Sequence, residues 1–266
     1  MRLITVPETF GALRVGFRFG EKGTHTSRTI MLAELEHVLA AAPSDSRRDD
    51  YAKAIVEENA ADKQTASTRK LTNQRLGELY ALDPAVPLFR VLRRLWDLDM
   101  RSHPLLALLC ALARDPLLRA TATPVLAMAP GMELARQHLT DAVRDAVGRR
   151  LNDSILDKVV RNAASSWTQS GHLNGRARKV RQRVSPTPGS TAYALALGYL
   201  LGYRGHRLLD TLWAKVLDVS SAEVLGPAHD AKRMGLLDIK QAGEIVEINF
   251  PTLLTAEERQ LRYGTD

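Results

Sequence analysis

Ten basic side chains lie between Arg144 and Val184, a stretch that holds only three acidic ones. The whole chain has a formal charge of +7, and this stretch accounts for all of it. Guanidinium and ammonium groups gathered in this way form surfaces that bind the phosphates of nucleic acids. The five closest together are Arg176, Arg178, Lys179, Arg181 and Arg183. We therefore expect this stretch to face a polyanion.

The residues before this cluster predict a helix over 153–170. Its apolar side chains recur at helical spacing from Ile155 to Trp167, and Gly171 is suited to end it. Asn174-Gly175, the strongest two-residue signal for a β-hairpin, follows. The pattern therefore predicts a helix and then a hairpin whose second strand is basic.

A strand would order the arginines of this hairpin. A spacing of two places Arg176 with Arg178, and Arg181 with Arg183, on one face. A helix followed by a basic hairpin is typical of a winged helix, whose hairpin, or wing, contacts phosphates. The alternative is a basic loop without a specific partner. We favour the wing because the hairpin signal and the end of the helix coincide. The side chains expected to face the DNA groove from the helix are Lys158, Arg161 and Asn162.

The N-terminal part predicts helices over 27–41, 48–60 and 65–82, with a strand near residues 13–19. The last two helices, separated by a short break, form the pattern of a helix-turn-helix over about 28–82. Donor-rich side chains in the early turns of the third helix predict a second DNA contact through Arg69, Lys70, Asn73 and Arg75. The alternative is the solvated polar face of an ordinary helical hairpin.

Apolar helices dominate the middle of the chain. The runs at 104–113 and 192–201 are shorter than the roughly 20 residues that span a bilayer, so we predict two buried core helices. The N-terminal residues lack the pattern of a signal peptide, and the single Cys110 excludes an internal disulfide. We expect a cytoplasmic protein without a membrane partner.

The C-terminal part repeats the arrangement of helices and hairpin. Helices are predicted over 191–203, 207–218, 220–225 and 226–234, and strands over 236–240 and 244–250. This second hairpin carries Asp238, Glu244 and Glu247, so it suits packing or a protein partner better than phosphate. The expected fold is a mainly α helical bundle with helix-turn-helix and winged-helix units and short β-hairpin wings. Its domains would be residues 1–130, 131–189 and 190–266.

Residues for catalysis are not apparent in the sequence. The seven histidines show no metal-ligand spacing, and the chain lacks the motifs of a phosphate loop, a nucleophile elbow or a zinc protease. We expect no enzyme activity, no cofactor and no metal.

The order of these segments resembles the BrxA family of BREX (bacteriophage exclusion) phage-defence systems. The likeness lies in Thr65-Ala-Ser-Thr-Arg-Lys-Leu71, in Leu88-Phe-Arg-Val-Leu-Arg-Arg-Leu95, in the apolar Leu105–Leu112 and in the C-terminal winged helix. The resemblance implies a non-enzymatic DNA-binding accessory protein that acts beside a methyltransferase and ATPase components.

The sequence therefore predicts a protein that binds double-stranded DNA, mostly through phosphates. The resemblance implies that it works with other proteins of a defence system. Two alternatives remain. One is a winged-helix module that assembles proteins, and the other is a transcriptional regulator with a defined operator. A regulator would be expected to dimerise, and the sequence shows no dimerisation seam.

Overall fold

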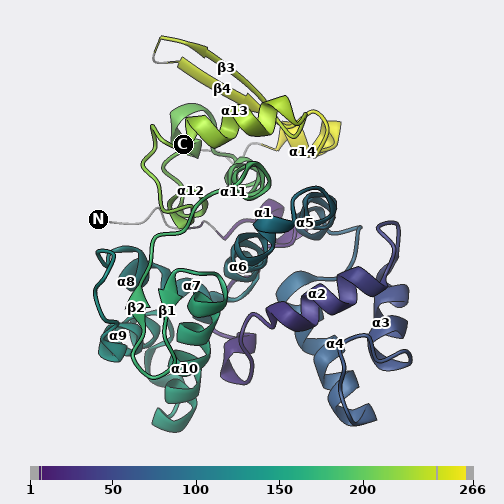
Figure 1. Ribbon diagram of the computed structural model, residues 1–266, viewed down its shortest axis with the longest axis vertical. Coiled ribbons are helices and arrows are strands. Elements are labelled where there is room, and N and C mark those ends of the chain that lie inside the picture. The colour runs from purple at the N-terminus through teal and green to yellow at the C-terminus, as the bar shows by residue number, and fades with distance from the viewer. Residues whose placement is uncertain (1–5, 7, 244, 262–266) are drawn as a thin grey trace.

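The computed structural model describes residues 6, 8–243 and 245–261, and it is mainly helical with two small antiparallel β-hairpins (Figure 1). This confirms the predicted fold class at that level. Glu244 of the predicted second hairpin lies outside the described residues. Among the residues described, no helix has the length and apolar character needed to cross a membrane.

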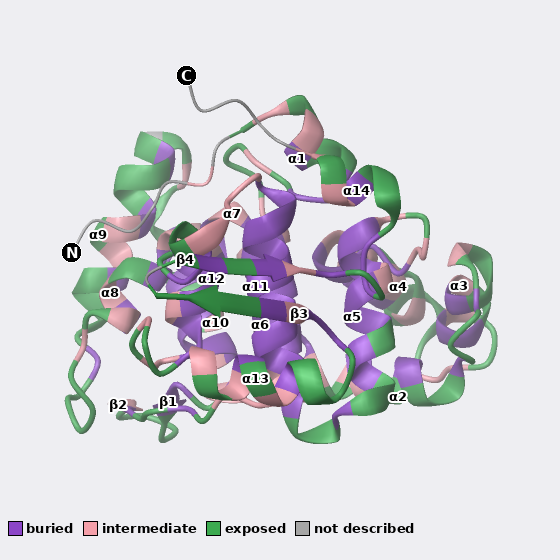
Figure 2. Cartoon of the chain, turned by 90° about the horizontal axis from the view of Figure 1, so that it is seen from above, coloured by how far each residue is buried: buried purple, intermediate pink, exposed green. Residues whose placement is uncertain are grey.

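Two helices form the centre of the molecule, α6 (His103–Arg114) and α11 (Pro188–Leu200). Residues 105–113 of α6 and 189–200 of α11 are all buried, and both helices appear in the buried colour in Figure 2. They pack on each other, and α5 (Pro87–Leu98) packs on both. A helix that is apolar on all sides has to be enclosed by other elements. The prediction of two buried core helices is confirmed.

The N-terminal part packs against one side of this core. Its elements are α1 (Phe10–Arg14), the 3-10 turn η1 (Thr24–Thr26), α2 (Leu32–Ala41), α3 (Arg48–Val56) and α4 (Ala66–Tyr80). The strand predicted near residues 13–19 is wrong, because α1 occupies the start of that range and residues 15–19 form a turn and a loop. The first long helix begins five residues later than predicted. Just before and at the start of this helix, the backbone is bonded to side chains of α10: the Ile30 amide donates to Ser166 and the Leu32 amide donates to Gln169.

The chain runs from α6 to the basic region through α7 (Pro116–Ala120), α8 (Ala122–Leu126), α9 (Arg136–Val147) and the 3-10 turn η3 (Gly148–Arg150). Another 3-10 turn, η2 (Met100–Ser102), lies between α5 and α6. The turn η3 is followed by α10 (Asp153–Gln169), which the Asn152 side chain caps by accepting from the Ile155 amide. The predicted helix over 153–170 is confirmed to within one residue.

The first hairpin is smaller than predicted. Strand β1 (Leu173–Asn174) pairs with β2 (Val180–Arg181), and a five-residue loop joins them in place of a two-residue turn. Gly175 sits in that loop at φ +110°, where an added Cβ would lie 1.9 Å from the Arg178 carbonyl oxygen. The loop therefore folds back on itself, and Arg176 and Arg178 belong to it rather than to a strand.

The segment 131–134 runs antiparallel to β2. The Arg181 amide donates to the Met132 carbonyl at 2.8 Å, and the Leu134 amide donates to the Lys179 carbonyl at 2.7 Å. Strand β2 thus lies between β1 and this segment, which places the start of α9 beside the hairpin.

The C-terminal part covers α11 with η4 (Gly205–Leu208), α12 (Leu212–Val216), α13 (Leu225–Arg233) and α14 (Ala256–Gln260). Strands β3 (Asp238–Ala242) and β4 (Ile245–Asn249) form the predicted second hairpin, with Ile239 opposite Ile248. The helix predicted over 207–218 is shorter, and the one predicted over 220–225 is a set of turns up to the start of α13.

His172 joins the end of α10 to α12. Its ring is fully buried edge-on to Trp167, Nδ1 lies 2.9 Å from the Ser170 hydroxyl, and Nε2 lies 2.9 Å from the Val216 carbonyl oxygen, to which it donates. Burial, and then the positive charge of Arg181, lower the pKa of His172 to about 4. The folded protein therefore holds a neutral imidazole at neutral pH.

We expect His172 to make the protein less stable in mild acid. The unfolded chain binds a proton at this residue near pH 6.5, whereas the folded chain resists it down to about pH 4. The free energy of unfolding should fall by about 3 kcal/mol across that window. Urea titrations of the wild type and of His172→Gln between pH 7 and pH 4 test this. Parallel loss of stability in the two proteins would contradict it, because glutamine does not titrate.

Candidate nucleic-acid interface

A pocket of about 820 Å³ lies between α10, the β1–β2 hairpin and the start of α9. Its lining includes Leu134, three small or hydroxyl residues of α10 and residues of the hairpin loop, but no acidic residue. Four of the lining residues are basic: Arg136, Arg161, Arg176 and Lys179. We call this feature the hairpin pocket. A pocket lined by four cationic side chains and no acidic one favours the binding of an anion.

Helix α10 provides one wall of the hairpin pocket. Arg161, Ala164, Ser165 and Thr168 are spaced so that they share one face of the helix. The alanine and the two hydroxyl residues are small, which leaves room in front of the helix. Lys158 is exposed one turn before Arg161, and it extends the positive face toward the start of α10.

The hairpin loop is fastened to this wall by Lys179. Its ammonium group donates to the Thr168 hydroxyl at 2.8 Å and to the Gly175 carbonyl at 3.2 Å. Partial burial lowers the pKa of Lys179. Arg178 points outward, with its side chain 83 % exposed and 3.4 Å from Glu133, and Arg183 is exposed beyond the end of β2.

One carboxylate balances part of this charge from outside the hairpin pocket. Asp157 lies 2.7 Å from Arg136 and 3.1 Å from Arg161, and all three side chains are about half exposed. Exposed ion pairs contribute at most about 1 kcal/mol each. Both arginines can therefore exchange Asp157 for a phosphate at little cost.

Arg181 corrects the sequence-based interpretation. Its side chain is 1 % exposed, and its guanidinium pairs with Asp218 at 2.6 Å. It also donates to the carbonyls of Val125, His172 and Gln182. The expected phosphate contact by Arg181 is wrong, because the residue anchors the hairpin to the core. The prediction that Arg181 and Arg183 share one face of a strand is also wrong, because β2 ends at Arg181.

Asn162 is a second correction. Its amide donates to the His25 carbonyl at 2.8 Å, which turns the side chain toward η1 rather than toward a groove. Of the predicted cations that remain on α10 and the hairpin loop, Arg161, Arg176 and Lys179 meet in the hairpin pocket. Lys158 and Arg178 are exposed outside its lining. The sequence-based interpretation missed Arg136, because its place depends on the pairing of 131–134 with β2.

The residues predicted on α4 are mostly engaged within the chain. Arg69 donates to the Lys63 carbonyl, and Arg75 pairs with Glu78 at 2.8 Å. The side-chain oxygen of Asn73 accepts hydrogen bonds from both terminal nitrogens of Arg48. Lys70 is exposed. Helix α4 also stands apart from α10 (Figure 1), so the structure does not join these residues to the hairpin pocket.

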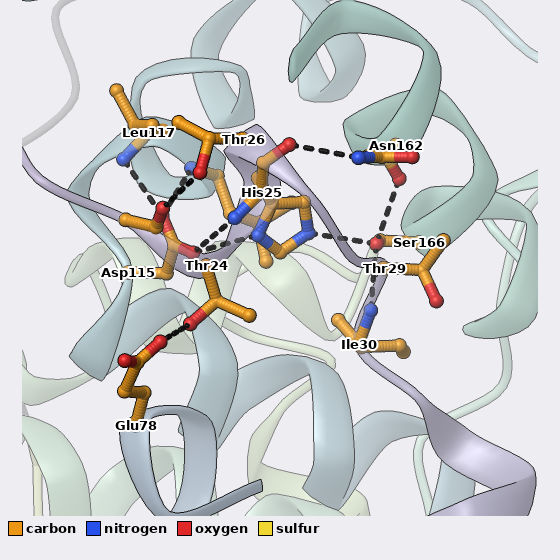
Figure 3. A network of polar contacts seen from close by, with 12 residues as sticks. Thr24, His25, Thr26, Thr29, Ile30, Glu78, Asp115, Leu117, Asn162 and Ser166 are labelled. Atoms are coloured by element: carbon orange, nitrogen blue, oxygen red, sulfur yellow. Dashed lines mark hydrogen bonds and ion pairs between the residues drawn. The ribbon is translucent and has the colours of Figure 1, made fainter. Parts of the chain in front are cut away.

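A buried polar junction lies between these two helices (Figure 3). His25 Nδ1 lies 2.7 Å from Asp115 Oδ2, and His25 Nε2 lies 2.8 Å from Ser166 Oγ. Burial by itself raises the pKa of Asp115, but the charge and hydrogen bonds of His25, with the Leu118 amide, bring it below its ordinary value. The carboxylate is therefore ionised at neutral pH.

Aspartate, histidine and serine in this order resemble the triad of a hydrolase, but the environment favours a structural role. All three side chains are buried, and Ser166 Oγ accepts from the Ile30 amide at 3.0 Å and donates to the Asn162 carbonyl at 2.9 Å. A substrate carbonyl has no approach to that oxygen in this arrangement. The junction instead ties η1 to α7 and α10, and the Thr24 hydroxyl ties it to Glu78 of α4.

The described residues contain no group of three or more His, Cys, Asp or Glu side chains placed to hold a metal ion. The chain matches no protein-family model and no curated protein at a significant level. The resemblance to the BrxA family thus rests on the sequence patterns alone.

Proposed function

We propose that this chain is a non-enzymatic DNA-binding protein that holds the phosphate backbone of a duplex across the hairpin pocket. The observation that carries the proposal is the convergence of Arg136, Arg161, Arg176 and Lys179 on one opening without a lining carboxylate. These residues come from three elements, α9, α10 and the loop between β1 and β2. Their meeting is a property of the tertiary structure and not of local composition.

The order of elements supports a winged helix as the frame of this surface. Helix α8 is followed by the extended segment 131–134, by α9 and α10, and then by the β1–β2 hairpin that pairs with that segment. In a winged helix the last helix enters the major groove and the hairpin contacts the flanking backbone. Helix α10 would be the recognition helix, with Lys158 and Arg161 on its exposed side.

The resemblance to the BrxA family supports a role for this DNA binding in phage defence. In that role the chain would act as an accessory that holds DNA beside partner proteins. The buried state of the Asp115–His25–Ser166 junction supports a function without catalysis.

A salt titration of binding to a random duplex tests the proposal. If about five phosphates are contacted, the logarithm of the association constant should fall with the logarithm of salt concentration at a slope of roughly −4 to −5. Single-stranded DNA and RNA of equal length serve as comparison ligands. Binding that does not change with salt, or no binding to duplex at 50 mM salt, would refute the proposal.

A further inference from the structure

A second basic pocket, of about 320 Å³, lies on a different part of the molecule. Its walls are α4, the segment 18–26 and the residues around η3. The basic residues that line it are Arg18, Lys22, Arg75, Arg114 and Arg150. Only two acids, Glu21 and Glu78, share the lining. We call this feature the η1 pocket.

Both acids of the η1 pocket are already paired with arginines. Glu21 lies 2.8 Å from Arg150, and Glu78 lies 2.8 Å from Arg75. Burial raises the pKa of Glu78, but hydrogen bonds from Arg75, Thr24 and Gln74 bring it below its ordinary value. The Glu78–Arg75 pair is therefore ionic at neutral pH. Each of the two acids pairs with one of the five cations.

The other three cations have no carboxylate partner in the part of the chain that the structure describes. Within the described residues, Arg18, Lys22 and Arg114 form no ion pair with an acidic side chain. Arg114 donates to the carbonyls of Gly16, Gly77 and Glu78, which fixes its guanidinium in place. Arg18 donates to the same Glu78 carbonyl at 3.3 Å, so two positive groups converge on one oxygen.

This convergence of like charges costs free energy. Burial, and in addition the charge of Arg18, lower the pKa of Arg114. An anion in the η1 pocket would remove the repulsion and would face three positive charges that the protein leaves uncompensated. Arginine forks bind tetrahedral oxyanions through paired hydrogen bonds, which favours phosphate over chloride.

We propose that the η1 pocket binds a phosphate group. Its volume lies at the lower end of the range for small-ligand sites, which fits a phosphate with a small attached group. The phosphate could be carried by a small molecule or by a nucleic acid strand. The proposal does not rest on DNA binding at the hairpin pocket, because the two pockets share no lining residue.

Inorganic phosphate is the first probe, added to the full chain at ionic strength matched with sodium chloride. We expect saturable NMR shifts of the Gly23 and Thr24 amides, and at least a tenfold weaker dissociation constant in Arg18→Gln/Lys22→Gln. Both side chains are exposed, so their replacement leaves the core intact. The matched control is Arg101→Gln/Lys240→Gln, which removes two exposed charges elsewhere and should keep the wild-type constant.

A short duplex is the second probe and identifies the source of the phosphate. If the duplex moves the same amides and binds Arg18→Gln/Lys22→Gln more weakly, the proposal holds with a nucleic acid as the source. If inorganic phosphate shifts these amides and the duplex does not, the proposal holds with a small molecule as the source of the phosphate. No shift with either probe, an equal shift with chloride, or equal constants in variant and wild type overturns it. Arg161→Gln/Arg176→Gln/Lys179→Gln should leave the phosphate constant unchanged, which separates this proposal from the DNA-binding one.

Discussion

Replacing Arg181 with methionine will lower the free energy of unfolding by about 3–5 kcal/mol, the range measured when one partner of a buried ion pair is removed. The guanidinium is 1 % exposed and 2.6 Å from Asp218. Methionine fills much of the space, but among the described residues it leaves the Asp218 carboxylate with the Val184 amide at 3.1 Å as its one hydrogen-bond donor. It also leaves the Val125 and His172 carbonyls without this donor. Urea denaturation followed by circular dichroism measures the loss.

Arg183 provides the matched control. It is exposed two residues along the chain, so Arg183→Met should change stability by less than about 0.5 kcal/mol. Combining Arg181→Met with Asp218→Asn should cost less than the sum of the single changes, because the second removes the stranded charge. Asparagine tolerates the positive φ of 63° at that position. A loss below 1 kcal/mol for Arg181→Met would show that the hairpin does not depend on this anchor.

Replacing Arg161, Arg176 and Lys179 together with glutamine will weaken duplex binding several hundredfold at 0.1 M salt. Each phosphate contact contributes about 0.9 to the slope of log affinity against log salt, so three losses should flatten the slope by about 2.7. The three residues line the hairpin pocket and are not buried in the core. Fluorescence anisotropy over 50–300 mM salt measures both quantities.

The comparison for this variant removes the same charge from other surfaces. Lys53, Arg101 and Lys240 are exposed and lie outside the hairpin pocket, so their triple replacement by glutamine should leave the slope within about 0.5 of the wild type. If the two triple variants weaken binding equally, net charge rather than the hairpin pocket governs affinity. If the variant of Arg161, Arg176 and Lys179 keeps the wild-type slope, the DNA-binding surface lies elsewhere, and Lys70 on α4 is the next residue to test.

Local patterns in the sequence were sufficient for α10, which forms one wall of the hairpin pocket, and for the two core helices. The stripe from Ile155 to Trp167 predicted α10 closely, and the two uniformly apolar runs predicted the buried α6 and α11. These features depend on residues within one or two helical turns of one another, and periodicity reports such neighbours directly. The concentration of positive charge after Arg144 likewise required only composition.

Which charges face solvent was decided by the tertiary structure. Arg181 and Arg183 look equivalent in the sequence, yet a carboxylate 37 positions away draws one of them into the core. Arg136 enters the hairpin pocket because the segment 131–134 pairs with a strand far along the chain. The junction of His25, Asp115 and Ser166 joins residues separated by 90 and 141 positions. No local pattern encodes such contacts, because the desolvation and hydrogen bonding that select them exist only once the chain has folded.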